Sequence, residues 1–186
     1  MSSLNLLEHD YDILLMLPYA RAQDRLAGLR HLLGAPATWH YHEHGQPFCL
    51  CHKQRYFASA AHTDHHEIIA ISQTLSIGVD IERVDRKINI DRLVTRFWPN
   101  SERVGLHILS PDAAQSSALR QWVRREAMVK SMGKGLARHL NDYEPLEDIQ
   151  SNMAGYKSWV YEGFVLGLAW RGSKSPPRIG LLELPT

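Results

Sequence analysis

Apolar and polar positions alternate along the first half of the chain in short, distinct patterns. Leucines recur at helical spacing within residues 21–33, just before a glycine and a proline, so an amphipathic helix is predicted there. Residues 39–66 are histidine-rich and strand-like, with a turn at residues 45–47 (Gly-Gln-Pro). Isoleucine and valine dominate residues 67–72 and 76–83, which predicts two strands joined by a short turn.

The second half of the chain shows longer helical patterning and one late hairpin. Asn100 or Ser101 could cap a short helix that runs to Ile108. Ser110 followed by proline is a helix start signal, and nothing breaks the pattern before Gly133, so residues 111–132 are predicted to form one helix. Apolar segments on either side of residues 162–163 predict a hairpin, and a proline loop precedes a last strand-like segment, residues 179–184. Short strands alternating with single helices indicate an α+β fold without independent, linker-separated domains.

Composition adds limits on the class of protein. With 186 residues and 44% apolar content, the chain can bury a sizeable core. No apolar run approaches the roughly 20 residues of a membrane span, and the charged N-terminal residues do not resemble a secretory signal, so we expect a cytoplasmic protein without a membrane partner. Because the formal net charge is only +1, we expect no nucleic-acid partner. The two cysteines are expected to be reduced thiols.

Positive charge is nevertheless concentrated in one nineteen-residue segment of the chain. Its cations are Arg120, Arg124, Arg125, Lys130, Lys134 and Arg138. Such a segment is either a solvated helix face or a surface that complements an anionic ligand or an acidic protein.

The strand predicted at residues 76–83 carries acidic side chains on one face. Since successive side chains alternate faces, Gly78, Asp80 and Glu82 share the face opposite the isoleucines and the valine. Two carboxylates roughly 6 to 7 Å apart along a strand repel each other unless a cation lies between them. Mg²⁺, which takes oxygen ligands, suits that position, whereas a solvated acidic edge strand is the simpler alternative.

A second acidic position lies near the end of the predicted helix. Glu126 has Lys130 and Trp122 one turn away on the same face. Alone, Glu126 and Lys130 would form an ordinary ion pair worth a few tenths of a kcal/mol. Together with Asp80 and Glu82, Glu126 offers a third carboxylate for a metal, and Lys130 a cation for a phosphate.

The two motifs together, GVDIE and WVRREAMVK followed by SMGKG, resemble the signature of the 4'-phosphopantetheinyl transferases, in which h-G-h-D-h-E precedes W-x-x-K-E-A-x-x-K. The chain is too long for the small trimeric holo-acyl-carrier-protein synthases and looks closest to the monomeric, two-lobed, surfactin-synthetase-activating branch. Residues 45–47 are similar to the family's G-K-P turn, and residues 56–63 to its F-N-x-S-H segment. Weaker likeness extends to Arg25, residues 96–102 and the late hairpin.

The resemblance implies two similar α+β lobes related by a pseudo-twofold axis, residues 1–74 and residues 75–186, with coenzyme A between them. The 4'-phosphopantetheine group would pass to a serine hydroxyl of an apo acyl, peptidyl or polyketide carrier protein, releasing 3',5'-ADP, in fatty acid or secondary metabolite biosynthesis. The expected metal ligands for Mg²⁺ are Asp80, Glu82 and Glu126. The expected catalytic residues are Glu126, as general base, and Lys130. The expected coenzyme A contacts are Gly45, Gln46, Pro47, His62, Lys130 and Arg25, the last of which could equally be an ion-paired helix residue.

Two positions depart from the family pattern. Ala61 stands where the family has a serine before the histidine, and Arg125 replaces the lysine that precedes the glutamate. Arginine keeps the charge but changes the donor geometry. We therefore expect weaker or retuned coenzyme A binding with the metal ligands intact. The family's carriers are acidic, so the basic helix segment would attract one, and Phe97 and Trp98 would add an apolar contact or belong to the core.

Histidines provide the competing interpretation. Seven of the eleven lie between His40 and His66, and His40, His42 and His44 would share one strand face, a geometry that suits zinc. A histidine-rich metal-binding or sensing protein is the alternative function, and a degenerate coenzyme A-binding relative without activity is another.

Overall fold

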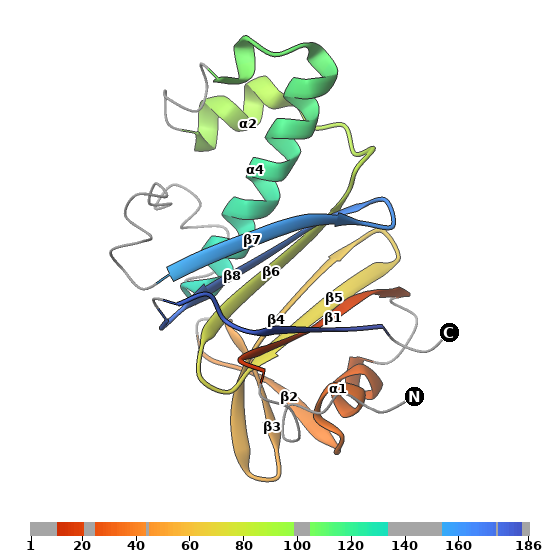
Figure 1. Ribbon diagram of the computed structural model, residues 1–186, viewed down its shortest axis with the longest axis vertical. Coiled ribbons are helices and arrows are strands. Elements are labelled where there is room, and N and C mark those ends of the chain that lie inside the picture. The colour runs from red at the N-terminus through yellow and green to blue at the C-terminus, as the bar shows by residue number, and fades with distance from the viewer. Residues whose placement is uncertain are drawn as a thin grey trace.

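The computed structural model describes residues 11–20, 25–43, 45–98, 105–133, 154–173 and 175–183, without the side chains of Ala20, Val94, Thr95 and Phe97. The strands are β1 Ile13–Ala20, β2 Ala37–Tyr41, β3 Pro47–Cys51, β4 Gln54–Thr63, β5 His66–Ser72, β6 Ser76–Arg83, β7 Ala154–Tyr161, β8 Phe164–Arg171 and β9 Ile179–Leu182. The helices are α1 Arg25–Leu33, α2 Ile90–Phe97 and α4 Pro111–Ser131. Figure 1 shows their arrangement. This is the mixed α+β architecture that the sequence predicts.

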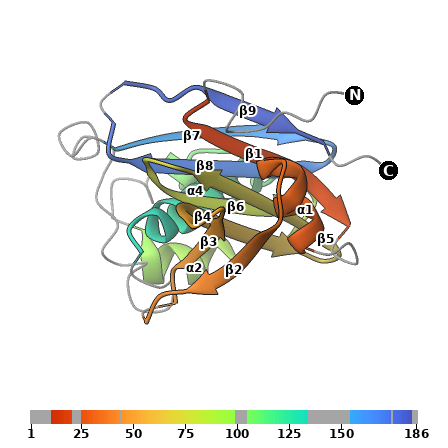
Figure 2. The same cartoon turned by 90° about the horizontal axis from the view of Figure 1, so that it is seen from below.

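Six strands form the first sheet, in the order β2-β3-β4-β5-β1-β9. Adjacent strands of this sheet run antiparallel, with one exception. Strand β9 runs parallel to β1, and Ile13 lies opposite Ile179. Figure 2 shows β9 beside β1 at one side of this sheet. The proline loop and strand predicted near residue 179 are therefore confirmed. The boundary predicted between residues 74 and 75 separates the strands of the two sheets except β9, which returns to the first.

Three strands form the second sheet, in the order β6-β8-β7. The late hairpin is confirmed as β7 and β8, joined by a turn at residues 162–163. The strands predicted at residues 67–72 and 76–83 are confirmed too, but β5 and β6 belong to different sheets. The predicted alternation within β6 holds, because Ile77, Val79 and Ile81 all point into the apolar core between the sheets.

The molecule is layered around three interfaces. Helix α1 packs its leucines on the outer face of the first sheet, where Leu29, Leu32 and Leu33 meet Met16 and Ile69. Side chains of both sheets fill the middle interface. Helix α4 covers the outer face of the second sheet, away from α1 (Figure 1). Both faces of β6 are therefore covered, which buries its acidic side chains as well as its apolar ones.

Helix α4 is the predicted helix, with Ser110 as N-cap and proline at its first turn. Helix α1 covers residues 25–33 of the segment predicted, and residues 21–24 lie outside the described part. Residues 105–107 are helical and belong to the predicted short helix. The predicted start of that helix, within residues 99–104, lies outside the described part of the chain. Helix α2 was not predicted. Among the helices that the structure describes, none is both long and apolar enough to cross a membrane.

Candidate active site

Gly78 lets β6 approach α4 unusually closely. A Cβ atom there would lie 2.0 Å from the carbonyl oxygen of Ala127 and 2.5 Å from the backbone nitrogen of Ser131, so no other residue fits without moving helix or strand. Because side chains two apart share a strand face, this approach places Asp80 against the helix face that carries Glu126 and Lys130. The glycine of the GVDIE motif thus has a packing reason that joins the two motifs.

Asp80, Glu126 and Lys130 form one ionic cluster at this junction. The Lys130 Nζ donates a hydrogen bond of 2.7 Å to Oδ1 of Asp80 and lies 3.5 Å from Oε2 of Glu126. Asp80 is 4% exposed, while the side chains of Glu126 and Lys130 are 18% and 17% exposed. The i,i+4 pair expected on the helix is present, and a buried strand carboxylate shares its lysine.

Electrostatics of this cluster favour added positive charge, either a proton on Glu126 or a cation. Burial and, next, the negative charge of Asp80 raise the pKa of Glu126 to about 7, although Lys130 opposes the shift. The Oδ2 atom of Asp80 is buried and accepts no hydrogen bond from the described residues. One lysine therefore does not neutralise two carboxylates, and an acceptor atom remains to be satisfied.

Glu82, the other carboxylate of the strand motif, makes different contacts. It is 6% exposed, its Oε2 accepts a hydrogen bond of 3.1 Å from Oγ1 of Thr63, and its Oε1 is ion-paired with Arg86. Within the described residues, no three histidine, cysteine, aspartate or glutamate side chains lie close enough together to hold a metal ion. The structure thus brings Asp80 and Glu126 together, while Glu82 is paired with its own cation.

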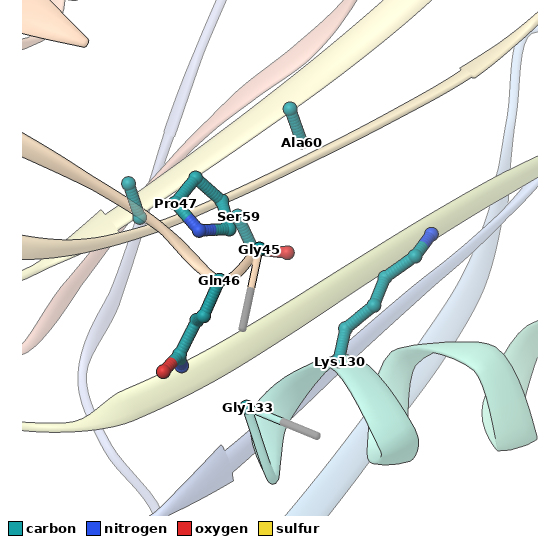
Figure 3. Close-up of a pocket in the computed structure, with 8 residues that line it drawn as sticks. Gly45, Gln46, Pro47, Ser59, Ala60, Lys130 and Gly133 are labelled. Atoms are coloured by element: carbon teal, nitrogen blue, oxygen red, sulfur yellow. The ribbon is translucent and has the colours of Figure 1, made fainter. Parts of the chain in front are cut away.

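A pocket of about 190 Å³ opens beside Lys130, between β4 and the C-terminal end of α4. Figure 3 shows Lys130, which extends from α4, on one side of the pocket and the turn of residues 45–47 on the other. Its lining consists of Gly45, Gln46, Pro47, Ala58, Ser59, Ala60, Lys130 and Gly133. Four of the residues predicted to contact coenzyme A, the three turn residues and Lys130, therefore line one pocket. The small β4 side chains and Gly133 were missed, although a run of small residues in a strand is a signal for such a surface.

The turn is attached to α4 by Gln46. Its side chain packs where a Cβ atom on Gly133 would lie, at 2.5 Å, and Gly133 has a φ of +71°. Nε2 of Gln46 also donates a hydrogen bond of 3.4 Å to Oγ of Ser76, which in turn donates one of 2.8 Å to the carbonyl oxygen of Ser131. The first sheet and the helix are thus linked at the pocket by the polar side chain of Gln46, beside a residue whose positive φ favours glycine.

The other two predicted coenzyme contacts, Arg25 and His62, do not line the pocket. His62 is exposed on β4, with Glu67 directly opposite in register. Glu67 is buried, accepts a 2.5 Å hydrogen bond from the Tyr19 hydroxyl, and is ion-paired with Arg25, which also lies over the ring of Trp39. Arg25 thus makes the ion pair that its alternative interpretation expects, and its contact with coenzyme A stays a prediction.

Both departures from the family pattern lie away from the pocket. Ala61 is buried in the core between the sheets, on the face of β4 that meets the second sheet. Arg125 is 2% exposed, with its guanidinium 5.0 Å from the centre of the Trp98 ring. Neither side chain lines the pocket, so no contact within the described residues supports the expected weakening of coenzyme A binding. Arg125 instead packs in the core beside α4.

The basic segment of α4 is not one continuous patch. Arg120 is exposed, but Arg125 is buried, Lys130 is bound to carboxylates, and Arg124 lies 5.9 Å from the Tyr156 ring. Lys134, Arg138 and residues 99–102 lie outside the described part, as does the side chain of Phe97. Trp98 is core, stacked on Trp122 at 6.3 Å. A groove that the sequence did not suggest is lined by Arg86, Lys87, Ile88, Asn89, Arg92, Leu93 and Arg96.

The histidine segment has ordinary surface contacts in the described residues. His40 stacks on Phe48 at 5.2 Å, and the side chain of His42 contacts Arg55. His44 lies outside the described part. Cys49 and Cys51 are free and buried. No contact here favours the metal-sensing alternative.

Comparison with known proteins adds independent information. A family model described as the 4'-phosphopantetheinyl transferase superfamily matches residues 76–173, more than half of the chain. The chain is 27% identical over 110 residues to a Synechocystis sp. protein provisionally named 4'-phosphopantetheinyl transferase, covering 59% of this chain and 45% of that protein. It is also 28% identical over 78 residues to the 4'-phosphopantetheinyl transferase HetI of Nostoc sp. (42% and 33% covered). A further match is the 4'-phosphopantetheinyl transferase gsp of Aneurinibacillus migulanus, 29% identical over 83 residues (45% and 34% covered).

These matches span less than half the length of each relative. The family-matched residues include Asp80, Glu82, Glu126 and Lys130, but not the turn at residues 45–47.

Proposed function

Because the chain belongs to the 4'-phosphopantetheinyl transferase superfamily, we propose that it transfers 4'-phosphopantetheine from coenzyme A to a serine hydroxyl of an apo acyl or peptidyl carrier protein. The observation that carries the proposal is the cluster in which Lys130 binds Asp80 and Glu126 while lining the pocket beside the turn of residues 45–47. This one arrangement combines a phosphate-binding cation, a carboxylate with a pKa near neutrality, and a cleft.

Glu126 is the proposed general base. In the metal-free chain its pKa of about 7 makes the carboxylate a proton acceptor near neutral pH, and a bound cation would favour its ionised form. It would take the proton from the carrier serine, directly or through a water, as the serine oxygen attacks the β-phosphorus of coenzyme A. The bond from that phosphorus to the bridging oxygen breaks, and 3',5'-ADP leaves with the bond's electron pair. Lys130 would offset negative charge on the phosphates.

The carboxylates suit a hard divalent cation. Asp80 has an unsatisfied buried oxygen, and burial together with the charge of Asp80 raises the pKa of the neighbouring Glu126, so an added cation would relieve the repulsion. We infer that Asp80 and Glu126 hold Mg²⁺, with Glu82 as third ligand once it is released from Arg86. When bound, Mg²⁺ would neutralise charge on the pyrophosphate.

Coenzyme A would occupy the pocket between β4 and the C-terminal end of α4. Gly45, Gln46 and Pro47 would border its adenosine end. His62 lies on the same face of β4 as the pocket residues Ala58 and Ala60, so a longer ligand leaving the pocket along that strand would reach it and Arg25 beyond. The proposed lobes are residues 1–74 and 75–186, in the monomeric, surfactin-synthetase-activating arrangement, with β9 exchanged to the first lobe's sheet.

The test is a transfer assay with intact mass spectrometry. The protein, coenzyme A, Mg²⁺ and a panel of apo carriers should yield a carrier heavier by about 340 Da, the mass of the group moved by metal-assisted phosphoryl transfer. Asp80→Asn and Glu126→Gln should abolish the gain, whereas Asp112→Asn, an exposed acidic residue in the first turn of α4, should not. Coenzyme A binding without transfer to any carrier would indicate a degenerate relative instead.

A further inference from the structure

Glu82 differs from the other two carboxylates because its cation comes from outside the pocket. Arg86 follows β6 by three residues and binds Oε1 of Glu82, while Thr63 donates to Oε2. Both carboxylate oxygens are therefore engaged. The side chain of Glu82 is 8% exposed but that of Arg86 is 48% exposed, so the arginine can leave toward solvent while the glutamate stays buried.

We propose that Arg86 and a divalent cation compete for Glu82, so that Arg86 is a positioning residue that sets the metal affinity of the site. This inference rests on the proposed function, which makes Glu82 a metal ligand. A buried ionised carboxylate is costly without a positive partner. Arg86 supplies that partner in the metal-free protein and must give it up when Glu82 binds metal.

Charge around Arg86 makes the exchange feasible. The groove that Arg86 lines also contains Lys87, Arg92 and Arg96. These like charges repel Arg86 and so weaken its ion pair with Glu82. Lys130 bridges Asp80 and Glu126 but makes no ion pair with Glu82. Lys130 and Arg86 therefore pair with different carboxylates. A half-exposed ion pair of this kind is worth up to about 1 kcal/mol, which corresponds to roughly fivefold in metal affinity.

Manganese binding to the metal-free full chain, without coenzyme A, tests the competition. Free Mn²⁺ would be followed by electron paramagnetic resonance for the wild type, Arg86→Gln, Arg86→Lys, Glu82→Gln and the Arg86→Gln/Glu82→Gln double variant. Arg92→Gln is the matched control, because it removes the same charge from the same groove. We expect Arg86→Gln to bind Mn²⁺ roughly fivefold more tightly, and Arg86→Lys and Arg92→Gln to stay within about twofold of the wild type. In the Glu82→Gln background, Arg86→Gln should have no effect.

Three results would overturn the inference. An equal gain in Mn²⁺ affinity in Arg86→Gln and Arg92→Gln would show a long-range charge effect. Unchanged or weaker Mn²⁺ binding in Arg86→Gln would show that Arg86 does not compete. A gain from Arg86→Gln that persists in the Glu82→Gln background would show that the effect does not act through Glu82. Asp80→Asn separates this from the proposed function. If Asp80→Asn abolishes Mn²⁺ binding while Arg86→Gln leaves it unchanged, only the competition fails. If Mn²⁺ binding does not depend on Asp80, the proposed metal site fails with it.

Discussion

Removing the Lys130 amine while keeping the length of the side chain, as in Lys130→Met, tests the ionic cluster without any ligand. In the wild type the lysine holds two carboxylates, one of them almost fully buried. Breaking a buried pair by deleting one partner costs about 3 to 5 kcal/mol. Because this site is partly exposed and Glu126 can keep its proton instead, we expect a loss of about 2 kcal/mol in the free energy of unfolding near pH 8.

The loss should depend on pH in a defined direction. Near pH 5.5, below the folded pKa of about 7, Glu126 is protonated and the lysine holds only Asp80, so the expected loss falls to about 1 kcal/mol. Urea unfolding in the presence of a chelator at both pH values measures this difference. Lys157→Met, on an exposed position of β7, is the matched control and should change stability by less than about 0.5 kcal/mol. A Lys130→Met loss that is absent near pH 8, or larger near pH 5.5, would refute the reasoning.

Three further predictions concern individual contacts. The raised pKa of Glu126 means that the folded chain keeps this proton at pH values where the unfolded chain has lost it. The free energy of unfolding of the metal-free chain should therefore fall by up to about 3 kcal/mol as pH rises from about 4.5 to 7. Glu126→Gln should remove that pH dependence in urea titrations. Gly78→Ala should cost about 3 kcal/mol or prevent folding, whereas Gly105→Ala, which meets no atom within 4 Å, should be neutral in thermal unfolding. Tyr19→Phe should cost about 1 to 2 kcal/mol near pH 7, because the buried Glu67 carboxylate loses a donor, and urea unfolding would detect it.

Local patterns in the sequence predicted the elements that carry local signals. Helix α4 has a serine and a proline at its start and no breaker within it, and β6 alternates cleanly, so both were predicted with their faces. Strand β1 was missed because its residues are apolar without alternation and include Pro18, a pattern that does not distinguish strand from helix. Helix α2 has only eight residues, too few for its periodicity to stand out.

Contacts between distant segments decided the rest of the site. The resemblance to the family motifs predicted that Asp80 and Lys130 belong to one site, but nothing local places Gln46 against Gly133 or Arg86 on Glu82. Arg125 shows the limit most clearly. A cation in a basic segment is expected on the surface, whereas Arg125 is buried with its guanidinium over the Trp98 ring, a contact that local sequence does not indicate.

The parallel pairing of β9 with β1 also imposes a delay during synthesis. The backbone N–H of Arg178, just before β9, binds the carboxylate of Asp12 next to β1, across 166 residues. At ribosomal rates of 5 to 20 residues per second, β1 would wait roughly 10 to 30 s before its partner emerges. During that interval one edge of an apolar strand has no neighbour and can pair with another chain. That edge of β1 therefore stays open to mispairing until β9 completes the sheet.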